Sequence, residues 1–333
     1  MRTTPGSSTS RYRWRRGTPC SPAVQPHRDV LREREGPLLG GLDLRERLLA
    51  ADARIVGEEH VEAVTCLVPS AHRGLRSTRE GRKQVTSQAT QGDPRVRIAG
   101  DEAWTLAAAE YGRMLELLRT LGAGDWTRPT DCAAWDVRGM LGHLAGAAEG
   151  WASPLELIHQ YWLGARLLRR GEVDGHLPVD GANAVQVRDR AGATTADLFA
   201  RYARATPRAV RWRRRLHRMP GSMQDDGGRF TMRELFDVIL TRDTWMHRVD
   251  IARATGREMV LTPGHDGRIV EDCVLDWAKK HGRPFSLVLG GQAGGRFDVG
   301  TGGPDIEIDA VEFVRALSGR GVREEILGTR VVF

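Results

Sequence analysis

The sequence predicts a mainly α fold, in which a helical bundle is followed by a small α+β domain and preceded by a disordered N-terminal extension. Three observations support this fold class. The first hundred residues have no periodic apolar face and are rich in Ser, Thr, Pro, Gly and paired Arg. From Asp101 onward, apolar residues recur at steps of three and four, the spacing of an amphipathic helix. After Leu261 the pattern changes to short alternating segments between glycine-rich turns.

These changes in pattern divide the chain into three segments. Residues 1–98 are predicted to be a basic, disordered extension, in which only Leu42–Leu49 has the pattern of a short helix. Residues 99–260 are predicted to form the helical bundle. Residues 261–333 are predicted to form the small C-terminal α+β domain.

Local capping signals set the helices of the bundle. The first helix begins at Asp101 and ends near Gly122, and a polar loop follows it. Asp136 can cap a second helix, which carries His143, because its carboxylate can accept from free amides two or three residues ahead. Thr231 and Glu234 form a capping box for a long helix that ends at Gly256. Helical patterns also cover residues 151–170 and 195–217.

The C-terminal segment alternates between helix and strand patterns. Helices are expected at residues 266–280 and 309–317. Strands are expected at residues 285–289, 296–299, 305–308 and 329–333. The glycines of GGQAGGRFDVGTGG have a spacing like that of dinucleotide-binding loops. Because a strand pattern rather than a helix follows them, hairpin turns explain them better.

The formal net charge of +7 does not indicate nucleic-acid binding, because all of the excess lies in the first hundred residues. That segment has 18 Lys and Arg against 11 Asp and Glu, whereas residues 101–333 have 32 of each. Nearly all of the basic residues are arginines, and they are spread evenly instead of forming a stripe that could follow a phosphate backbone. We therefore expect no nucleic-acid partner.

Composition also indicates a soluble, cytoplasmic protein without a membrane partner. No apolar run approaches the roughly 18 residues that a membrane-spanning helix needs. The basic N-terminus lacks the apolar stretch of a secretory signal. The cysteines lie far apart without a CxxC pair, which argues against a disulfide framework and fits a reducing compartment: Cys20, Cys66, Cys132 and Cys273.

One constellation carries the predicted chemistry. Asp243 and His247 are four residues apart, so both project from one face of the last long helix, on a stripe that is otherwise apolar. Polar groups on such a stripe are costly unless they bind each other or a ligand. A buried Asp–His hydrogen bond is one interpretation. His143 on a second core-facing helix favours the other, a divalent metal ion with open coordination positions.

The loop before His143 resembles the signature of the mycothiol-dependent maleylpyruvate isomerase family, within the DinB/YfiT-like metal-binding four-helix bundles. The segment DWTRPTDCAAWDVRGMLGHLAG fits the pattern W-x-x-P-T-x-C-x-x-W followed by a ligand His in H-L-A. The matching residues are Trp126, Pro129, Thr130, Cys132, Trp135 and His143. Asp243 and His247 in DTWMHRVDIARATG match a second element, and DAVEFVRALSGR is similar to the closing helix of the family. The resemblance covers residues 101–333.

The resemblance implies a DinB/YfiT-like four-helix bundle that holds its metal, with Zn²⁺ expected, through His143, Asp243 and His247. It implies mycothiol or a similar low-molecular-weight thiol as cofactor, in an isomerase or S-transferase. A thiolate at the metal would attack an electrophilic small molecule, so the expected partners are that electrophile and the thiol. The expected oligomeric state is a monomer or homodimer. Family members typically have Glu where this chain has the shorter Asp243, so a specific substrate is not inherited.

Two other functions fit the same residues. Water in place of the thiol would make the chain a metal-dependent hydrolase. A bundle that binds a metal or a small ligand without turnover would be a non-catalytic module. A cleft open to a thiol conjugate, and an electrophile consumed only with thiol present, would distinguish these functions.

Further polar residues have alternative roles. Asp250, three residues after His247, could orient the ligand imidazole or pair with an Arg. Arg320 could bind a substrate carboxylate or act as a helix C-terminal cation. Packing is favoured for Cys132 over a role as nucleophile, because no base is evident beside it. Surface or capping roles are favoured for His159, His176 and His217.

Overall fold

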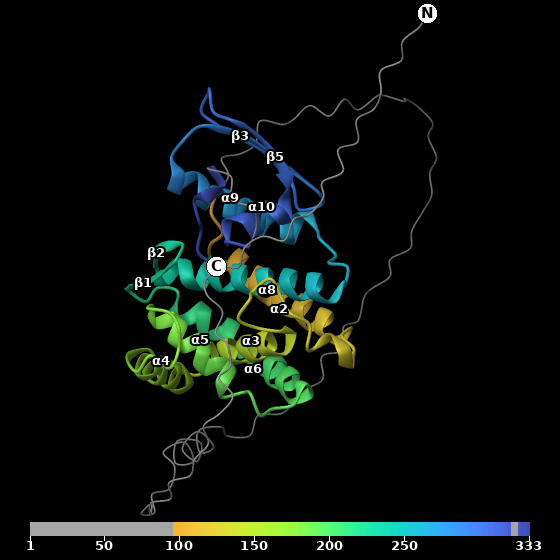
Figure 1. Cartoon of the computed structure of the whole chain (residues 1–333). Helices are drawn as coiled ribbons and strands as arrows, with labels where there is room; N and C mark the ends of the chain where they lie inside the picture. The colour runs from red at the N-terminus through yellow and green to blue at the C-terminus, as the bar shows by residue number, and fades with distance from the viewer. Residues whose placement is uncertain (1–95, 321–325) are drawn as a thin grey trace, which may run out of the picture. The chain divides into compact units, whose positions relative to one another are not determined.

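The computed structural model describes residues 96–320 and 326–333, which are mainly helical, as the sequence predicted, and also contain two small sheets (Figure 1). The α-helices in the described part are α2 (Asp101–Arg119), α3 (Val137–Ala152), α4 (Pro154–Arg169), α5 (Pro178–Arg188), α6 (Thr195–Leu216), α7 (Met232–Glu234), α8 (Leu240–Thr255), α9 (Arg268–His281) and α10 (Ala310–Leu317). None of the helices within these residues is long and apolar enough to cross a lipid bilayer.

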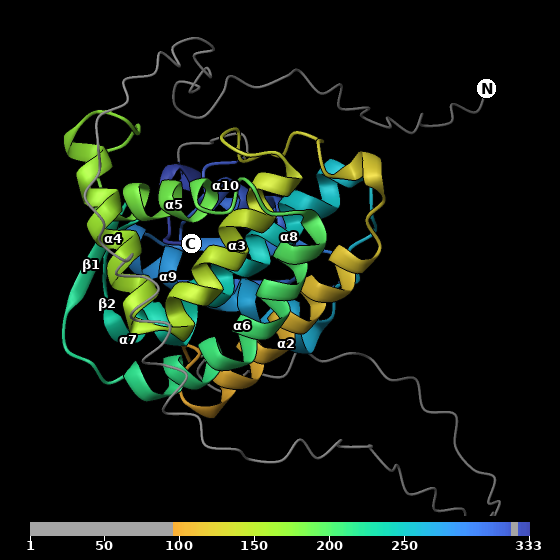
Figure 2. The ribbon, with the colours of Figure 1, turned by 90° about the horizontal axis from the view of Figure 1, so that it is seen from below.

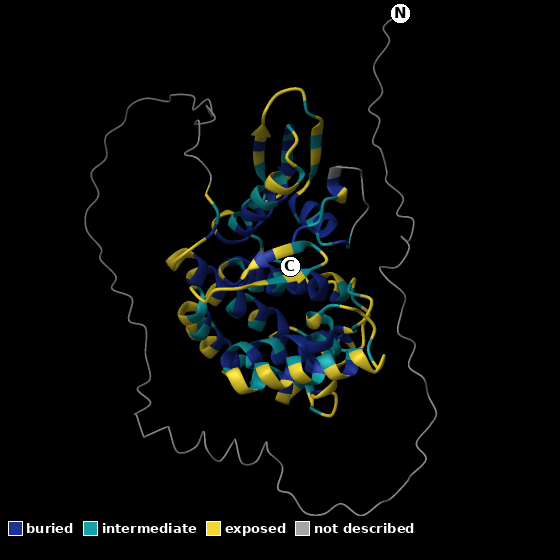
Figure 3. Cartoon of the chain, turned by 90° about the vertical axis from the view of Figure 1, so that its left-hand side faces the viewer, coloured by how far each residue is buried: buried dark blue, intermediate teal, exposed yellow. Residues whose placement is uncertain are grey.

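Helices α2, α3, α6 and α8 pack on one another in the lower part of Figure 1, and Figure 2 shows α3 running between α5, α6 and α8. All four contribute apolar side chains to one core, which stabilises their arrangement. Figure 3 shows buried residues in the interior of the helical region and exposed residues on its outer turns. Members of this core include Met114, Leu118, Met140, Leu144, Leu198, Tyr202 and Ile251.

The two predicted helix caps are confirmed. Asp136 Oδ1 accepts a 2.7 Å hydrogen bond from the amide of Gly139 at the start of α3. The Thr231 hydroxyl accepts from the amide of Glu234, and the Glu234 carboxylate accepts from the amide of Thr231. Both caps satisfy amide groups that the first helical turn leaves unpaired. Each predicted helix start therefore lies where its capping side chain indicated.

The helix predicted from Thr231 to Thr255 is interrupted, which the sequence did not indicate. After α7, residues Leu235–Ile239 form a turn of π-helix, and α8 begins at Leu240. The helix ends as predicted at Gly256, whose φ of 66° lies in the left-handed region that glycine adopts without strain. A hairpin of β1 (Ser222–Asp225) and β2 (Gly228–Thr231) precedes α7 and was also not predicted.

Helix α5 was not predicted, although it packs closely against α4 and α3. Its buried residues are Gly181, Ala182, Val185 and Gln186, so it has no large apolar side chain on its inner face. The contact with α4 is made between glycines. A Cβ atom added to Gly181 would lie 2.6 Å from the backbone of Gly164. The two backbones therefore touch at a distance that only small residues allow.

The C-terminal segment forms the expected α+β unit. Its sheet has the order β4 (Gly295–Val299), β3 (Phe285–Gly290), β5 (Asp305–Asp309), with β4 antiparallel and β5 parallel to the central β3. Helices α9 and α10 lie beneath this sheet in Figure 1, and their apolar side chains share one core with the sheet and with α8. Members of this core include Trp245, Val274, Trp277, Leu287, Phe313 and Leu317. A turn of π-helix at Pro263–Gly267 precedes α9, and a 3₁₀ turn covers Ile326–Gly328.

The final strand predicted at residues 329–333 is wrong. Residues 329–333 have no strand pairing, and the amide of Val331 donates instead to the carbonyl of Leu317 at the end of α10. Val331 and Val332 are both buried, each in a different apolar core. Two consecutive side chains are therefore buried on opposite sides of the chain. The predicted strand would have buried alternate side chains on one side only.

Residues 1–95 lie outside the described residues, and with them the predicted helix Leu42–Leu49 and most of the predicted extension. The end of that predicted segment is packed. Ile98 is buried, and its amide donates to Asp272 Oδ1 on α9 over 3.0 Å. Arg97 Nε donates to the same oxygen over 2.7 Å. Residues 97 and 98 thus belong with the folded part of the chain, on its α9 face.

Candidate metal centre

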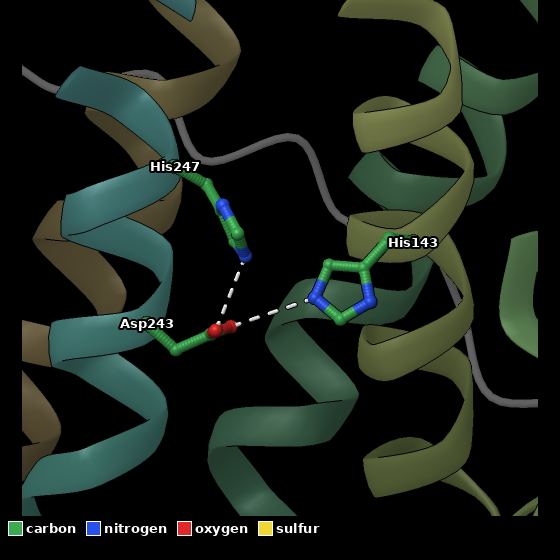
Figure 4. Close-up of side chains that lie close together, drawn as sticks. All are labelled: His143, Asp243 and His247. Atoms are coloured by element: carbon green, nitrogen blue, oxygen red, sulfur yellow. Dashed lines mark ion pairs between the residues drawn. The ribbon is translucent and has the colours of Figure 1, made fainter. Parts of the chain in front are cut away.

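Helices α3 and α8 bring three chemically active side chains together, which we name the His143 cluster: His143, Asp243 and His247. His143 lies in the second turn of α3, after the turn that Asp136 caps. Asp243 and His247 are one turn apart on α8. Figure 4 shows His143 reaching from α3 toward the other two side chains on the neighbouring helix. The spacing predicted from the sequence therefore places all three on facing helix surfaces.

The distances in this cluster are those of groups that can share one ion. His247 Nε2 lies 3.2 Å from Asp243 Oδ1, and His143 Nε2 lies 3.9 Å from Asp243 Oδ2. One ligand atom from each residue lies within 4.8 Å of the other two. Both histidines are buried, whereas the Asp243 side chain is 26% exposed. Asp243 therefore forms the side of the cluster that solvent or a small molecule can reach.

The ring of His143 is the least satisfied polar group of the cluster. Both its Nδ1 and its Nε2 are buried without a hydrogen-bond partner. A buried polar atom left in this way costs about 1–3 kcal/mol. A metal ion at Nε2 would remove part of that cost. The donor set of two imidazoles and one carboxylate suits Zn²⁺, so the residues fit a divalent cation.

Electrostatics favour the metal-binding form of two of the three side chains, Asp243 and His143. Burial disfavours the Asp243 carboxylate, but His247 and His143 hold its pKa well below the ordinary range, so it is an anion. Burial lowers the pKa of His143, which keeps its imidazole neutral. Burial also disfavours charge on His247, yet Asp243 and Asp250 raise its pKa to about 9. Carboxylate anions and neutral imidazoles are the forms that bind divalent metals, so His247 must release a proton when a cation binds.

Asp250 and Arg320 lie behind His247. Asp250 Oδ2 lies 3.2 Å from His247 Nδ1, where it can accept the ring proton and leave Nε2 facing Asp243. Arg320 Nε donates to Asp250 Oδ1 over 2.9 Å and to Oδ2 over 3.1 Å. Asp250 therefore makes both contacts weighed from the sequence, one to the imidazole and one to an Arg. The Arg320 guanidinium is engaged through Nε with this carboxylate, beside the cluster.

The loop before α3 covers His143. The Trp135 ring stacks on the His143 ring with centroids 4.5 Å apart and planes 22° apart. The Thr130 hydroxyl donates to the carbonyls of Cys132 and Trp135, which fixes this loop. Burial raises the pKa of the Cys132 thiol, so it stays protonated near neutral pH. A protonated, partly buried thiol fits the packing role expected for this residue.

The other histidines weighed from the sequence lie elsewhere. His159 pairs with Asp189 over 2.8 Å on the surface. His217 follows α6 as its C-cap, donates from Nδ1 to the Arg214 carbonyl, and makes an edge-type contact with the Trp104 ring. His176 is exposed in the turn before α5. None of the three joins the His143 cluster.

A second group with metal-ligand geometry was missed, and we name it the Glu110 cluster: Glu110, His265 and Asp266. All three residues are buried, and His265 Nε2 lies 2.7 Å from Glu110 Oε2. Arg248 donates to both carboxylates over 2.6 to 3.0 Å. Arginines therefore already neutralise this cluster. Glu110 on the apolar stripe of α2 was the sequence signal that could have revealed it.

Comparisons with known proteins relate part of the chain to one family of domains. Residues 107–252 match the family model described as mycothiol maleylpyruvate isomerase N-terminal domain. Two solved structures are similar: the mycothiol-dependent maleylpyruvate isomerase, at 16% identity, and a histidine-to-alanine mutant of it, at 15%. Each has a TM-score of 0.43 and covers 66% of this chain and 89% of its own. No curated protein sequence matches the chain. The match to this family model spans residues 107–252 and therefore includes the whole His143 cluster.

Proposed function

We propose that this protein is a metal-dependent isomerase or S-transferase that uses mycothiol or a similar low-molecular-weight thiol on an electrophilic small molecule. One observation carries the proposal. His143 has two buried ring nitrogens without partners, and one of them faces an anionic carboxylate and a second imidazole. This arrangement lies within a domain of the isomerase family. His143, Asp243 and His247 would hold the cation, with Zn²⁺ expected.

Each nearby side chain has a defined task in this proposal. A divalent cation at the cluster supplies Lewis acidity, which makes a thiol bound there available as thiolate at neutral pH. Asp243 would supply the anion that compensates part of the positive charge, and its side chain is partly exposed to solvent. Asp250 orients His247 through Nδ1. Trp135 covers one face of His143 and excludes water there.

A conjugated cis double bond is the substrate class that suits a thiol-dependent isomerase, and maleylpyruvate, the substrate in the names of the similar structures, is of this class. The thiolate sulfur forms a C–S bond to one alkene carbon, and the alkene electron pair moves into the conjugated carbonyl. Rotation about the resulting single bond and cleavage of the same C–S bond give the trans isomer and return the thiolate. In S-transfer the other former alkene carbon takes up a proton instead, and the C–S bond remains.

Thiol dependence tests the proposal directly. The full chain, loaded with one equivalent of Zn²⁺, is given maleylpyruvate with and without mycothiol, and cis and trans isomers are followed by NMR. Conversion that requires both metal and thiol is the expected result. Conversion to a hydrolysed product without thiol would instead support the metal-dependent hydrolase. A protein that binds zinc and thiol but converts no electrophile would support the non-catalytic module.

Two substitutions at Asp243 test the metal site itself. Asp243→Glu keeps the charge and should keep the metal, whereas Asp243→Asn keeps the size and should lose most of it, because two neutral imidazoles leave the dication uncompensated. In a metal-free hydrogen-bonded core the order reverses, since Asn still accepts a bond and the longer Glu disturbs packing. Bound metal and melting temperature of both variants decide. An Asn variant as metal-loaded and stable as the parent would remove Asp243 from the site.

A further inference from the structure

Two buried glutamines lie behind His143, where α4 and α5 pack on α3. Gln186 on α5 is 6% exposed, and Gln160 on α4 is fully buried. Glycines on α3 leave room for them. A Cβ atom at Gly146 would lie 2.6 Å from Gln186 Cβ, and one at Gly150 would lie 2.8 Å from Gln160 Oε1. The α3 surface beside His143 is therefore shaped around these two amide side chains.

Hydrogen bonds fix the direction of both amides. Gln160 Nε2 donates to the Gly146 carbonyl over 2.9 Å and to Glu156 Oε1 over 3.0 Å. Both partners are acceptors only, so the NH₂ group of Gln160 must face them and its Oε1 must face the other way. Gln160 Oε1 accepts from Gln186 Nε2 over 2.9 Å. The amide of Gln186 is thereby fixed as well, with its Oε1 turned away from Gln160.

Two buried atoms remain at the end of this chain of amides. Gln186 Oε1 and His143 Nδ1 both lack a hydrogen-bond partner. Gln186 Oε1 is an acceptor, and His143 Nδ1 is a donor when it carries the ring proton. The Gln186 side chain interacts with the His143 ring, and it packs against Gly146, which lies one helical turn after His143 on the same face of α3. Each atom is thus the complement that the other lacks.

We propose that Gln186 is a positioning residue for His143. Its Oε1 accepts a hydrogen bond from the Nδ1–H of His143, so that Nε2 of His143 is left unprotonated and faces Asp243. Gln160 acts through Gln186 by holding its amide in this direction. The consequence for metal binding rests on the proposed function, whereas the tautomer of His143 does not. Asp250 has the corresponding position at Nδ1 of His247. Both histidines therefore present Nε2, one through a neutral amide and one through a carboxylate.

The tautomer of His143 tests this inference without metal or turnover. Long-range proton–nitrogen NMR on the metal-free full chain reads which ring nitrogen carries the proton, and the signal lost in His143→Ala assigns it. We expect Nδ1–H in the parent and a mixture of tautomers in Gln186→Leu, which keeps the size and removes the acceptor. Gln186→Glu restores an acceptor and should restore the single tautomer. The exposed Gln224→Leu is the matched control.

Zinc affinity gives the second readout. Losing the group that orients a ligand imidazole typically costs about 10–100-fold in metal affinity, so Gln186→Leu should bind zinc more weakly by that factor and Gln186→Glu should recover most of it. An Nε2–H tautomer in the parent, or an unchanged single tautomer in folded Gln186→Leu, overturns the proposal. If Gln186→Leu does not fold, the parent tautomer decides alone. Nδ1–H in a protein that binds no zinc would refute the proposed function and leave this inference intact.

Discussion

The His143 cluster and the Glu110 cluster have nearly the same ingredients and opposite surroundings. Each gathers histidine and carboxylate groups within 4.8 Å. In the Glu110 cluster, Arg248 binds both carboxylates, and Arg113 also reaches Asp266. In the His143 cluster the one carboxylate pairs with histidines, and neither ring nitrogen of His143 has a hydrogen-bond partner among the described residues. The supply of countercharge, more than the set of ligand side chains, distinguishes a structural network from a candidate cation site.

Removing the countercharge of the Glu110 cluster should have the largest effect. Arg248→Met removes the guanidinium that the two buried carboxylates share, and breaking a buried ion pair in this way costs about 3–5 kcal/mol. Denaturant unfolding of the parent and the variant measures the loss. Arg253→Met is the control, because this residue lies on the same helix but forms half-exposed pairs worth about 1 kcal/mol or less. Equal losses in the two variants would contradict the contrast between buried and exposed networks.

Metal addition should separate the two clusters. Zinc at about a hundred times its dissociation constant should raise the free energy of unfolding by about 2.7 kcal/mol. His265→Ala should keep this gain and bind one equivalent, because the Glu110 cluster is neutralised without metal. His143→Ala should lose both the gain in stability and the bound zinc. Metal analysis and unfolding in parallel measure the two quantities, and two equivalents in the parent with one in His265→Ala would show that the Glu110 cluster binds metal.

Acid should weaken the Glu110 cluster by a smaller amount. Burial disfavours the Asp266 carboxylate, but Arg248 and the Thr262 amide hold its pKa below the ordinary value. A lowered pKa in the folded state gives stability that is complete above the unfolded value, about 3.9, and is lost as the pH falls below it. Asp266→Asn should therefore be less stable than the parent at pH 7, with a smaller difference at pH 3. Denaturant unfolding at both values measures the change, and an equal difference at both would rule out this contribution.

A surface pair should have the smallest effect. His159 and Asp189 are 2.8 Å apart, which is closer than the His–carboxylate pairs of the His143 cluster, but the His159 side chain is 46% exposed. Exposed pairs contribute about 0–1 kcal/mol, so His159→Ala should change the free energy of unfolding by less than about 1 kcal/mol. Zinc stoichiometry should not change. A larger loss of stability, or a loss of metal, would show that distance alone decides what a His–carboxylate pair does.

The sequence predicted the features that depend on residues close in the chain. Asp136 and Thr231 bond to amides three residues away, so their caps could be predicted from local order. Asp243 and His247 share a face of α8 because they are four residues apart. His143 joined the predicted site because a charged or polar group on an apolar helix stripe needs a partner, and the resemblance indicated the same residue.

The features that depend on distant contacts could not be predicted in the same way. His265 meets Glu110 across 155 residues, and no local pattern joins them. Helix α5 buries small residues and a glutamine, so its sequence lacks the apolar periodicity by which helices are recognised. Gln186 became relevant only once its position beside Gly146 was known. The π-helical turn at Leu235–Ile239 has no proline or glycine to mark it.

The contact between Gly164 and Gly181 bears on how this chain can change in evolution. Each glycine fills the space into which a side chain at the other would project. An alanine at either position must separate α4 from α5, after which a second alanine meets little resistance, so the two changes cost less together than separately. The same separation would draw Gln160 away from Gln186 and reach His143 through them. Substitutions at these two glycines are therefore coupled in evolution. The first change away from glycine is the costly one, and the second costs less.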